Sequence, residues 1–171
     1  DIEYFADGDE ELKRDVEYLV EVFTDAKEYG AILEVKKVNF EELKQRLREI
    51  ENEINLLFGD FREIILQVLP ILIKQGEIIN SKYHVCITNP PYMSRSGMND
   101  KIKNYIDNCY SNENKDLFSV FIHRNDKFLK NGCFNSQVTM ESWMFLSSFE
   151  EFRAWILKSN TIVSLIHMPY D

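Results

Sequence analysis

The sequence predicts an α/β protein whose N-terminal half is helical and whose C-terminal half holds part of an open parallel sheet. Across residues 1–78, apolar side chains recur at three- and four-residue spacing, which is typical of amphipathic helices. Across residues 79–171, short apolar runs alternate with helical patterns over short connections, which is typical of strand–helix–strand units. About three strands are visible, and open parallel sheets usually contain more, so we expect the sheet to be incomplete.

Two amphipathic helices are predicted first. The first should end at Gly30, because glycine is common just past a helix C-terminus. Residues 31–38 fit either a short strand or an extended linker. The second should begin after Asn39, where Glu42 completes a capping-box pattern, and end at Gly59. The apolar stripes are Leu12, Val16, Leu19, Val20, Phe23 and Ala26 in the first helix, and Phe40, Leu43, Leu47, Ile50, Ile54 and Leu57 in the second.

A third helical segment is predicted over Phe61–Gln75, with Asp60 as its N-cap and Gly76 closing it. The segment is apolar nearly all round, which favours burial. Pro70 should kink or restart it, because proline lacks an N–H group and its ring clashes with the preceding turn.

Three short apolar runs in the C-terminal half are predicted to be buried strands. They lie at Tyr83–Thr88, Phe134–Met140 and Thr161–His167. The first is followed at once by Asn-Pro-Pro, which stops a strand because proline cannot donate a ladder hydrogen bond. Runs of this kind are typical of a parallel sheet with both faces covered.

Two helices are predicted between and after these strands. One covers Asp116–Leu129, and Gly132 should end it. The other is expected from a second capping-box pattern, formed by Ser148 and Glu151, and should run through Leu157.

Composition excludes several classes of protein. Apolar residues (44%) and charged residues (29%) occur in the proportions of a globular domain. The longest apolar stretch, Ile64–Ile73, is about half the length that spans a bilayer, so we expect no membrane contact. No secretory signal opens the chain. Cys86, Cys109 and Cys133 form no CxxC pair and the histidines are widely separated, so we expect no metal site and a reducing, cytoplasmic location.

Charge is distributed unevenly along the chain. Residues 1–78 hold 10 basic and 20 acidic side chains, whereas residues 79–171 hold 10 basic and 9 acidic. A polyanion would therefore have to approach the C-terminal half. Arg95, Lys101 and Lys103 lie there in and beside a stretch that should be mobile, and they could contact the phosphates of a nucleic acid; a plain solvated loop is an equally good interpretation.

The tetrapeptide Asn89-Pro90-Pro91-Tyr92, here called the motif loop, directly follows the first predicted strand. Ligands of open α/β sheets bind beyond the carboxyl ends of strands, so the position alone makes the loop a candidate site. Pro90 and Pro91 stiffen the loop and remove two backbone donors, leaving acceptor oxygens. The Asn89 side-chain oxygen and the Pro90 carbonyl could each accept one hydrogen from adenine N6, and Tyr92 could stack on a base extruded from the duplex.

The motif loop resembles motif IV of the amino-methyltransferases that use S-adenosylmethionine. Four further runs are similar to adenine-specific (N6) DNA methyltransferases of bacterial restriction-modification and BREX-type phage-defence systems. These runs are FTDAKEYG at residues 23–30, KDLF at 115–118, FLKNG at 128–132 and VTMESWMFLSS at 138–148. The last is the most distinctive, and the resemblance covers most of the chain.

The resemblance implies a partial Rossmann-like methyltransferase fold with S-adenosyl-L-methionine as cofactor and DNA as substrate. It implies a helical segment at residues 1–78, the C-terminal half of the catalytic domain at residues 79–171, and restriction or phage-defence subunits as possible partners. Asp116, Phe118 and Phe121 correspond to the motif whose aromatic residue lies near the adenosine of the cofactor. The six glycines form no GxG sequence. We therefore expect a fragment without the cofactor's glycine loop or a target-recognition domain, inactive and weak in cofactor binding by itself.

Other interpretations remain for these features. The paired prolines can simply end a strand, Tyr92 can be an ordinary half-buried aromatic residue, and Asp116 can be a helix N-terminal charge. Phe118 and Phe121 are more often core residues than cofactor contacts. A methyltransferase acting on a protein glutamine amide or on RNA could use the same loop, because those substrates also carry a planar amino group. A non-catalytic interaction module derived from a methyltransferase is the third alternative.

Overall fold

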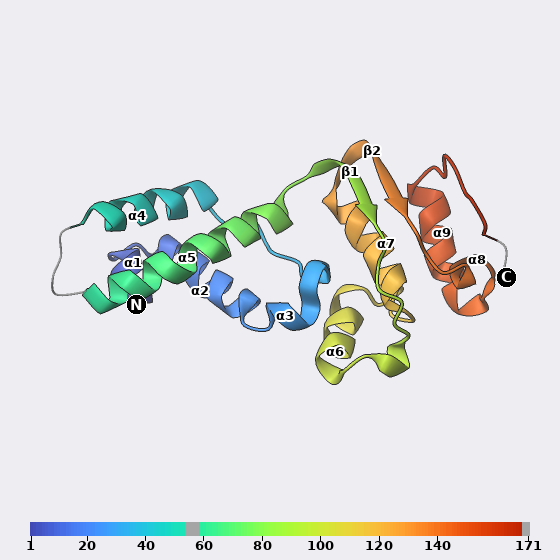
Figure 1. The fold of residues 1–171 in the computed structure, drawn as a ribbon, viewed down its shortest axis with the longest axis horizontal. Helices are drawn as coiled ribbons and strands as arrows, with labels where there is room; N and C mark the ends of the chain where they lie inside the picture. The colour runs from blue at the N-terminus through green and yellow to red at the C-terminus, as the bar shows by residue number, and fades with distance from the viewer. Residues whose placement is uncertain (54–58, 169–171) are drawn as a thin grey trace. The chain divides into compact units, whose positions relative to one another are not determined.

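The computed structural model describes residues 1–53 and 59–168 and divides the chain into two compact units, Asp1–Ser81 and Lys82–Asp171 (Figure 1). Within the described ranges, no helix is long and apolar enough to cross a membrane.

The first unit is helical: α1 (Ile2–Ala6), α2 (Glu10–Phe23), α3 (Ala26–Tyr29), the 3-10 turn η1 (Gly30–Ile32), α4 (Phe40–Asn52) and α5 (Gly59–Asn80). The second unit holds β1 (Tyr83–Thr88), η3 (Arg95–Gly97), α6 (Asp100–Cys109), α7 (Leu117–Phe128), β2 (Leu129–Gln137), α8 (Ser142–Phe145), η4 (Ser147–Phe149) and α9 (Glu150–Ser159).

The first predicted helix is divided in two. Helix α2 ends at Phe23 and α3 starts only at Ala26, so a continuous helix up to Gly30 was a wrong prediction. The hydroxyl of Thr24 donates to the Val20 carbonyl at 2.8 Å, a local hydrogen bond that weakens helix continuation. Gly30 nevertheless follows α3 with φ +54°, a backbone conformation that favours glycine.

The predicted N-cap of the second helix is confirmed, but the Asn39 backbone amide donates to the Asp15 carboxylate and not to Glu42 as a capping box requires. The Asn39 side-chain oxygen accepts from the Glu42 amide at 3.3 Å, and its amide group donates to the Glu42 carboxylate at 2.7 Å. Helix α4 ends at Asn52, so its predicted end at Gly59 is wrong, and Gly59 instead opens α5. The predicted stripe positions Ile54 and Leu57 lie outside the described residues. Residues 33–39 form a linker rather than a strand.

Helix α5 runs through both residues that were predicted to interrupt it. It continues past Pro70 and Gly76 to Asn80, and Asp60 lies inside it rather than capping it. Gly76 is a point of close packing: a Cβ atom there would lie 3.0 Å from the Phe40 ring and 3.2 Å from a Leu19 methyl group. Glycine therefore lets α5 approach α2 and the start of α4, and it does not end the helix.

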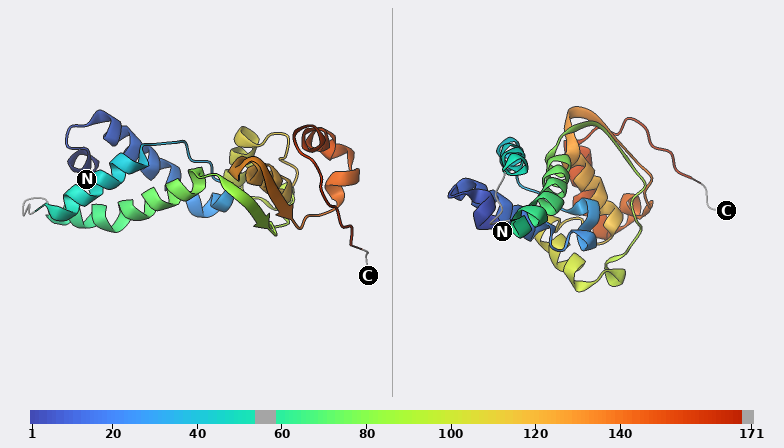
Figure 2. Two further views of the ribbon diagram at one scale, coloured as in Figure 1. Left: turned by 90° about the horizontal axis from the view of Figure 1, so that it is seen from above. Right: turned by 60° about the vertical axis from the view of Figure 1, so that its left-hand side comes forward.

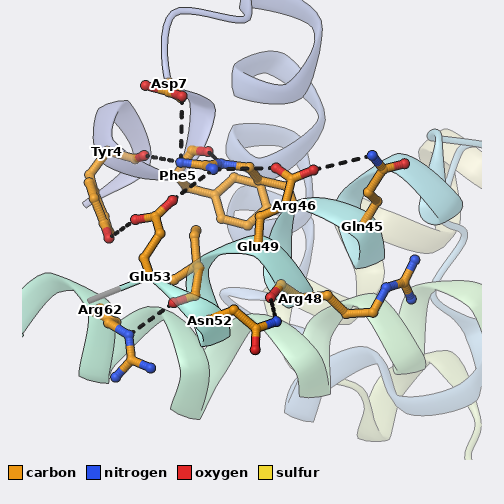
Figure 3. A network of polar contacts seen from close by, with 11 residues as sticks. Tyr4, Phe5, Asp7, Gln45, Arg46, Arg48, Glu49, Asn52, Glu53 and Arg62 are labelled. Carbon is orange, nitrogen blue, oxygen red and sulfur yellow. Dashed lines mark hydrogen bonds and ion pairs between the residues drawn. The ribbon is translucent and has the colours of Figure 1, made fainter. Parts of the chain in front are cut away.

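A buried arginine joins α1 to α4 (Figure 3). The Arg46 side chain donates from Nε to the Phe5 carbonyl at 2.8 Å and from a terminal nitrogen to Glu53 at 3.0 Å. Tyr4 donates its hydroxyl to the other Glu53 oxygen at 2.6 Å. Since Arg46 is only 8% exposed, these partners offset the cost of removing its charge from water.

The second unit contains a parallel pair of strands connected through α6 and α7. Figures 1 and 2 show β1 and β2 side by side with the same direction, and α7 packs against both strands. The register is regular from Val85 opposite Phe134 to Thr88 opposite Gln137. Nearer the strand starts it is irregular, and Gly132 lies there with φ +75°. Gly132 was predicted to end the preceding helix, which ends earlier, at Phe128.

The prediction that all strands are buried is wrong. Ile87 is 77% exposed and Val85 is also exposed, while Cys86 and Thr88 between and after them are half-buried. Phe134, the partner of Val85, is exposed as well, so one face of the sheet is bare within the described residues. The segment Thr161–His167 forms no strand and is exposed. A strand requires a neighbouring edge to pair with, and this segment does not pair with β1 or β2.

The last helix is held by an aromatic cluster rather than by the predicted cap. Ser148 lies within η4, and α9 begins after Phe149 without a side-chain cap. The aromatic cluster consists of Phe118, Phe149, Phe152 and Ile156, with Ile122, Trp143 and Trp155 packed around it. It joins α7 to α8 and α9.

Candidate active site

The motif loop begins where β1 ends, at the carboxyl end of the parallel pair. Pro90 is buried, whereas Asn89, Pro91 and Tyr92 are exposed. The Thr88 carbonyl accepts a hydrogen bond from the Val138 amide at 3.2 Å, so the chain beyond β2 lies beside the start of the loop. The loop is therefore a rigid corner at the end of the sheet with its polar side chain exposed.

Tyr92 closes the corner through its hydroxyl group. The hydroxyl oxygen lies 2.7 Å from the Asn89 side-chain oxygen and 3.1 Å from the Val138 carbonyl. A single phenolic hydrogen serves both acceptors, so the two contacts share one donor. The hydroxyl keeps the Asn89 oxygen at a defined place, and the ring remains 48% exposed. Both features are compatible with a planar group stacked on the ring beside that oxygen.

The downstream end of the motif loop is held by the residues before α7. The Met93 amide donates to the Asp116 carboxylate at 3.2 Å, and the Met93 carbonyl accepts from the Leu117 amide at 2.9 Å. The Arg95 amide donates to the Lys115 carbonyl at 3.0 Å. These bonds form a short antiparallel contact that ties the chain after Tyr92 to the start of α7.

Two of the three cations that were predicted to contact phosphates, Arg95 and Lys103, lie next to carboxylates. Arg95 forms a two-pronged ion pair with Asp107, with nitrogen–oxygen distances of 2.7 and 2.6 Å. The hydrogen bonds from Arg95 hold the pKa of the Asp107 carboxyl below its ordinary value. Lys103 lies 3.8 Å from Asp100, one turn away on α6, and Lys101 is exposed in the first turn of that helix. The stretch that contains Arg95 forms the turn η3 and the capped start of α6.

The three residues assigned to the cofactor are at the start of α7. Asp116 is the N-cap of this helix, and its carboxylate accepts from the Phe118 amide at 3.3 Å. Phe118 is 1% exposed and belongs to the aromatic cluster, with its ring centre 5.7 Å from that of Phe149. Phe121 is half-buried. Of the two aromatic side chains, Phe121 is the more accessible.

A cavity of about 630 Å³ lies beside the motif loop, at the end of β2. Its lining includes Val138, which contacts Tyr92, and Trp143, whose indole N–H donates to the Thr139 hydroxyl at 3.3 Å. Glu141 and His167 both line this cavity and contact each other through their side chains. Trp143 both lines the cavity and packs on the Phe152 ring.

Comparison with known proteins gives the family. The sequence matches the family described as Eco57I restriction-modification methylase over residues 11–171. The chain belongs to this family. The predicted resemblance to adenine-specific methyltransferases is thereby confirmed.

This methylase-family chain is similar to two proteins that are named adenine-specific methyltransferases. It is 34% identical over 152 residues to the adenine-specific methyltransferase BrxX of Escherichia coli O9:H4 (strain HS), an alignment that covers 86% of this chain and 12% of that protein. It is 33% identical over 97 residues to the adenine-specific methyltransferase PglX of Lacticaseibacillus casei (strain Zhang), covering 57% of this chain and 8% of that protein. The chain thus spans a small part of the length of these relatives.

Sequence reasoning missed two contributors to the site of this methylase-family chain. The Val138 carbonyl contacts Tyr92 although 46 positions separate them, and no local pattern signals such a contact. The role of Asp116 in holding Met93 is also invisible in the sequence, which indicates only a helix start. Within the described residues, no group of three or more histidine, cysteine, aspartate or glutamate side chains is placed to hold a metal ion.

Proposed function

We propose that this chain is part of a longer enzyme that transfers a methyl group from S-adenosylmethionine to N6 of adenine in DNA. The proposal rests mainly on the rigid corner of the motif loop. At the end of β1, the hydroxyl of the exposed Tyr92 ring contacts the Asn89 oxygen. Membership of the methylase family and the names of the two relatives support this function.

The motif loop would act on the amino group through its acceptors. Adenine N6 is a poor nucleophile because its lone pair is delocalised into the ring. The Asn89 oxygen has two lone pairs, so it can accept one N6 hydrogen while it accepts from Tyr92. The Pro90 carbonyl would accept the other hydrogen, which favours a tetrahedral nitrogen with its lone pair directed outward. Fixed dipoles of this kind contribute about 3–4 kcal/mol each to transition-state stabilisation.

Tyr92 and Pro91 would position the base. Stacking on an aromatic ring contributes about 1–3 kcal/mol per base, and the half-exposed Tyr92 ring is available for it. Pro91 restricts the backbone between Asn89 and Tyr92, and this restriction fixes the position of the ring relative to the Asn89 oxygen. Since N6 lies inside the duplex, the base must be flipped out before it reaches this corner.

The cofactor would be held jointly by this chain and the rest of the enzyme. S-adenosylmethionine supplies a methyl group already activated by a sulfonium. We assign the adenosine end of the cofactor to Phe121, whose half-buried ring is accessible, on the helix that Asp116 caps and that Phe118 anchors in the aromatic cluster. The sequence offers no GxG loop, so the fit of these residues to the cofactor is partial and binding by this chain alone should be weak.

The finer fold assignment is a partial Rossmann-like domain at residues 79–171, preceded by the helical segment at residues 1–78. The bare face of β1 and β2 supports it, because parallel sheets are covered on both faces when complete. Arg95, Lys101 and Lys103 would face the DNA backbone, with Arg95 and Lys103 exchanging their carboxylate partners for phosphate. We place the enzyme in the cytoplasm with restriction or phage-defence subunits as possible partners.

The test is the identity of the methylated product. The longer protein is incubated with S-adenosylmethionine labelled in the methyl group and with DNA, RNA and protein in parallel. Mass spectrometry of the digested DNA should show labelled N6-methyladenine. Label in RNA or on a protein glutamine would identify one of the alternative methyltransferases, and no transfer to any substrate would favour a non-catalytic module.

A further inference from the structure

We infer that Asp116 is a positioning residue for the motif loop, in addition to being the cap of α7. This inference rests on the proposed function for its catalytic consequence, but the structural part stands on contacts alone. One carboxylate oxygen of Asp116 accepts from two backbone amides in different segments, Met93 at 3.2 Å and Phe118 at 3.3 Å. It therefore joins the residue that follows the motif loop to the first turn of the helix.

The contact between Asp116 and Met93 can affect the motif loop because of where Met93 lies in the chain. Met93 directly follows Tyr92, whose hydroxyl fixes the Asn89 oxygen. On its upstream side the loop is already fixed, because β1 is paired with β2 up to Thr88. The downstream side is fixed by the bonds of Met93 and Arg95 to residues 115–117. Among these bonds, the one to Asp116 is made by a side chain and can be removed by substitution.

The anchor to which Asp116 connects the loop is rigid. Helix α7 carries Phe118 into the aromatic cluster, where it is 1% exposed. The oxygen of the Ser119 hydroxyl, which is fully buried, lies 2.6 Å from the Asp116 carbonyl and 2.7 Å from the Glu113 carbonyl, and its single hydrogen serves both acceptors. The backbone around Asp116 is thus fixed from the core side, so its carboxylate holds Met93 at a constant distance from the helix.

The first experiment measures amide hydrogen exchange by NMR in the 171-residue chain. In Asp116→Ala, the amides of Met93 and Phe118 should both exchange about fivefold faster, as expected for the loss of one ordinary hydrogen bond each. Asp116→Asn keeps the acceptor oxygen and should stay within about twofold of the unmodified chain. Asp9→Ala is the matched control, because the Asp9 carboxylate also accepts from two amides, those of Glu11 and Leu12, at the start of α2. It should leave the Met93 amide unchanged.

A second variant, Asp116→Ser, keeps the test valid if the alanine variant does not fold. Serine is itself a favoured N-cap, so Asp116→Ser should keep the start of α7 intact. Its side chain is shorter by one bond, and we expect it to retain protection of Phe118 while releasing Met93. Unchanged exchange of Met93 in both the alanine and the serine variants would overturn the inference and leave Asp116 as a helix cap alone.

The catalytic consequence is measured in the longer enzyme. Asp116→Ala should lower kcat about tenfold with the KM for S-adenosylmethionine within about twofold, and Asp116→Asn should recover most of kcat. A raised KM for the cofactor with unchanged kcat would show a cofactor contact instead of positioning. Absence of adenine methylation in the unmodified enzyme would contradict the proposed function, whereas the exchange result would still decide the structural role of Asp116.

Discussion

Replacement of Tyr92 by phenylalanine and by alanine separates the two roles that we propose for this residue. Phenylalanine removes the hydroxyl that contacts the Asn89 oxygen at 2.7 Å and the Val138 carbonyl at 3.1 Å but keeps the ring. Alanine removes both the hydroxyl and the ring. The difference between the two variants therefore isolates the stacking contribution.

The expected magnitudes follow from these contacts. The hydroxyl has one hydrogen, so Tyr92→Phe removes the equivalent of one net hydrogen bond, about 1 kcal/mol, or about fivefold in kcat/KM. Tyr92→Ala also removes stacking of the base on the ring, a further loss of about 1–3 kcal/mol. The combined loss of about 2–4 kcal/mol corresponds to about 30- to 900-fold.

The assay is methyl transfer to DNA by the longer enzyme under kcat/KM conditions, with circular dichroism as the control for folding. An alanine variant within about threefold of the unmodified enzyme would refute a stacking role for Tyr92. A phenylalanine variant as impaired as the alanine variant would mean that the ring contributes nothing beyond the hydroxyl contacts.

Two further predictions concern the stability of the first unit, measured by urea unfolding. Gly76→Ala should lower the free energy of unfolding by about 1 kcal/mol, because overpacking against Phe40 and Leu19 (about 1–3 kcal/mol) exceeds the gain in helix propensity (about 1 kcal/mol); Gly59→Ala, which meets open space, is the control, and an equal effect of the two would count against the packing argument. The hydrogen bond from Tyr4, aided by the charge of Arg46, lowers the pKa of Glu53, so its stabilising contribution should be complete above the unfolded pKa and be lost as pH falls through the folded one. Glu53→Gln should therefore lose less stability between pH 7 and pH 3 than the unmodified chain, and identical pH profiles would contradict the assignment.

Local signals in the sequence predicted the parts of the structure that depend on neighbouring residues. The Asn39 cap, the strand before the motif loop and the helix after Asp116 need only a few adjacent side chains to form, and all three are present. Family resemblance added what local patterns could not supply, namely the kind of enzyme to which the motif loop belongs.

Features that depend on distant residues were not predictable in the same way. Gly76 and Gly132 are both typical helix terminators, yet one lies where Phe40 approaches α5 and the other in an irregularity of the β1–β2 register. The apolar run of β1 indicates burial, but burial requires a covering layer, and Ile87 has none among the described residues. An apolar run in a sequence therefore indicates that a surface can be buried, but it does not indicate whether a covering layer is present.

The central claim is that the Asn89 oxygen polarises the adenine amino group, and the rate of the chemical step tests it most directly. The longer enzyme, saturated with S-adenosylmethionine and DNA, is followed through a single turnover in its unmodified form and as Asn89→Ala. The account predicts a rate of methyl transfer at least about 100-fold lower in the variant, with DNA binding little changed. A single-turnover rate within about threefold of the unmodified enzyme would contradict it.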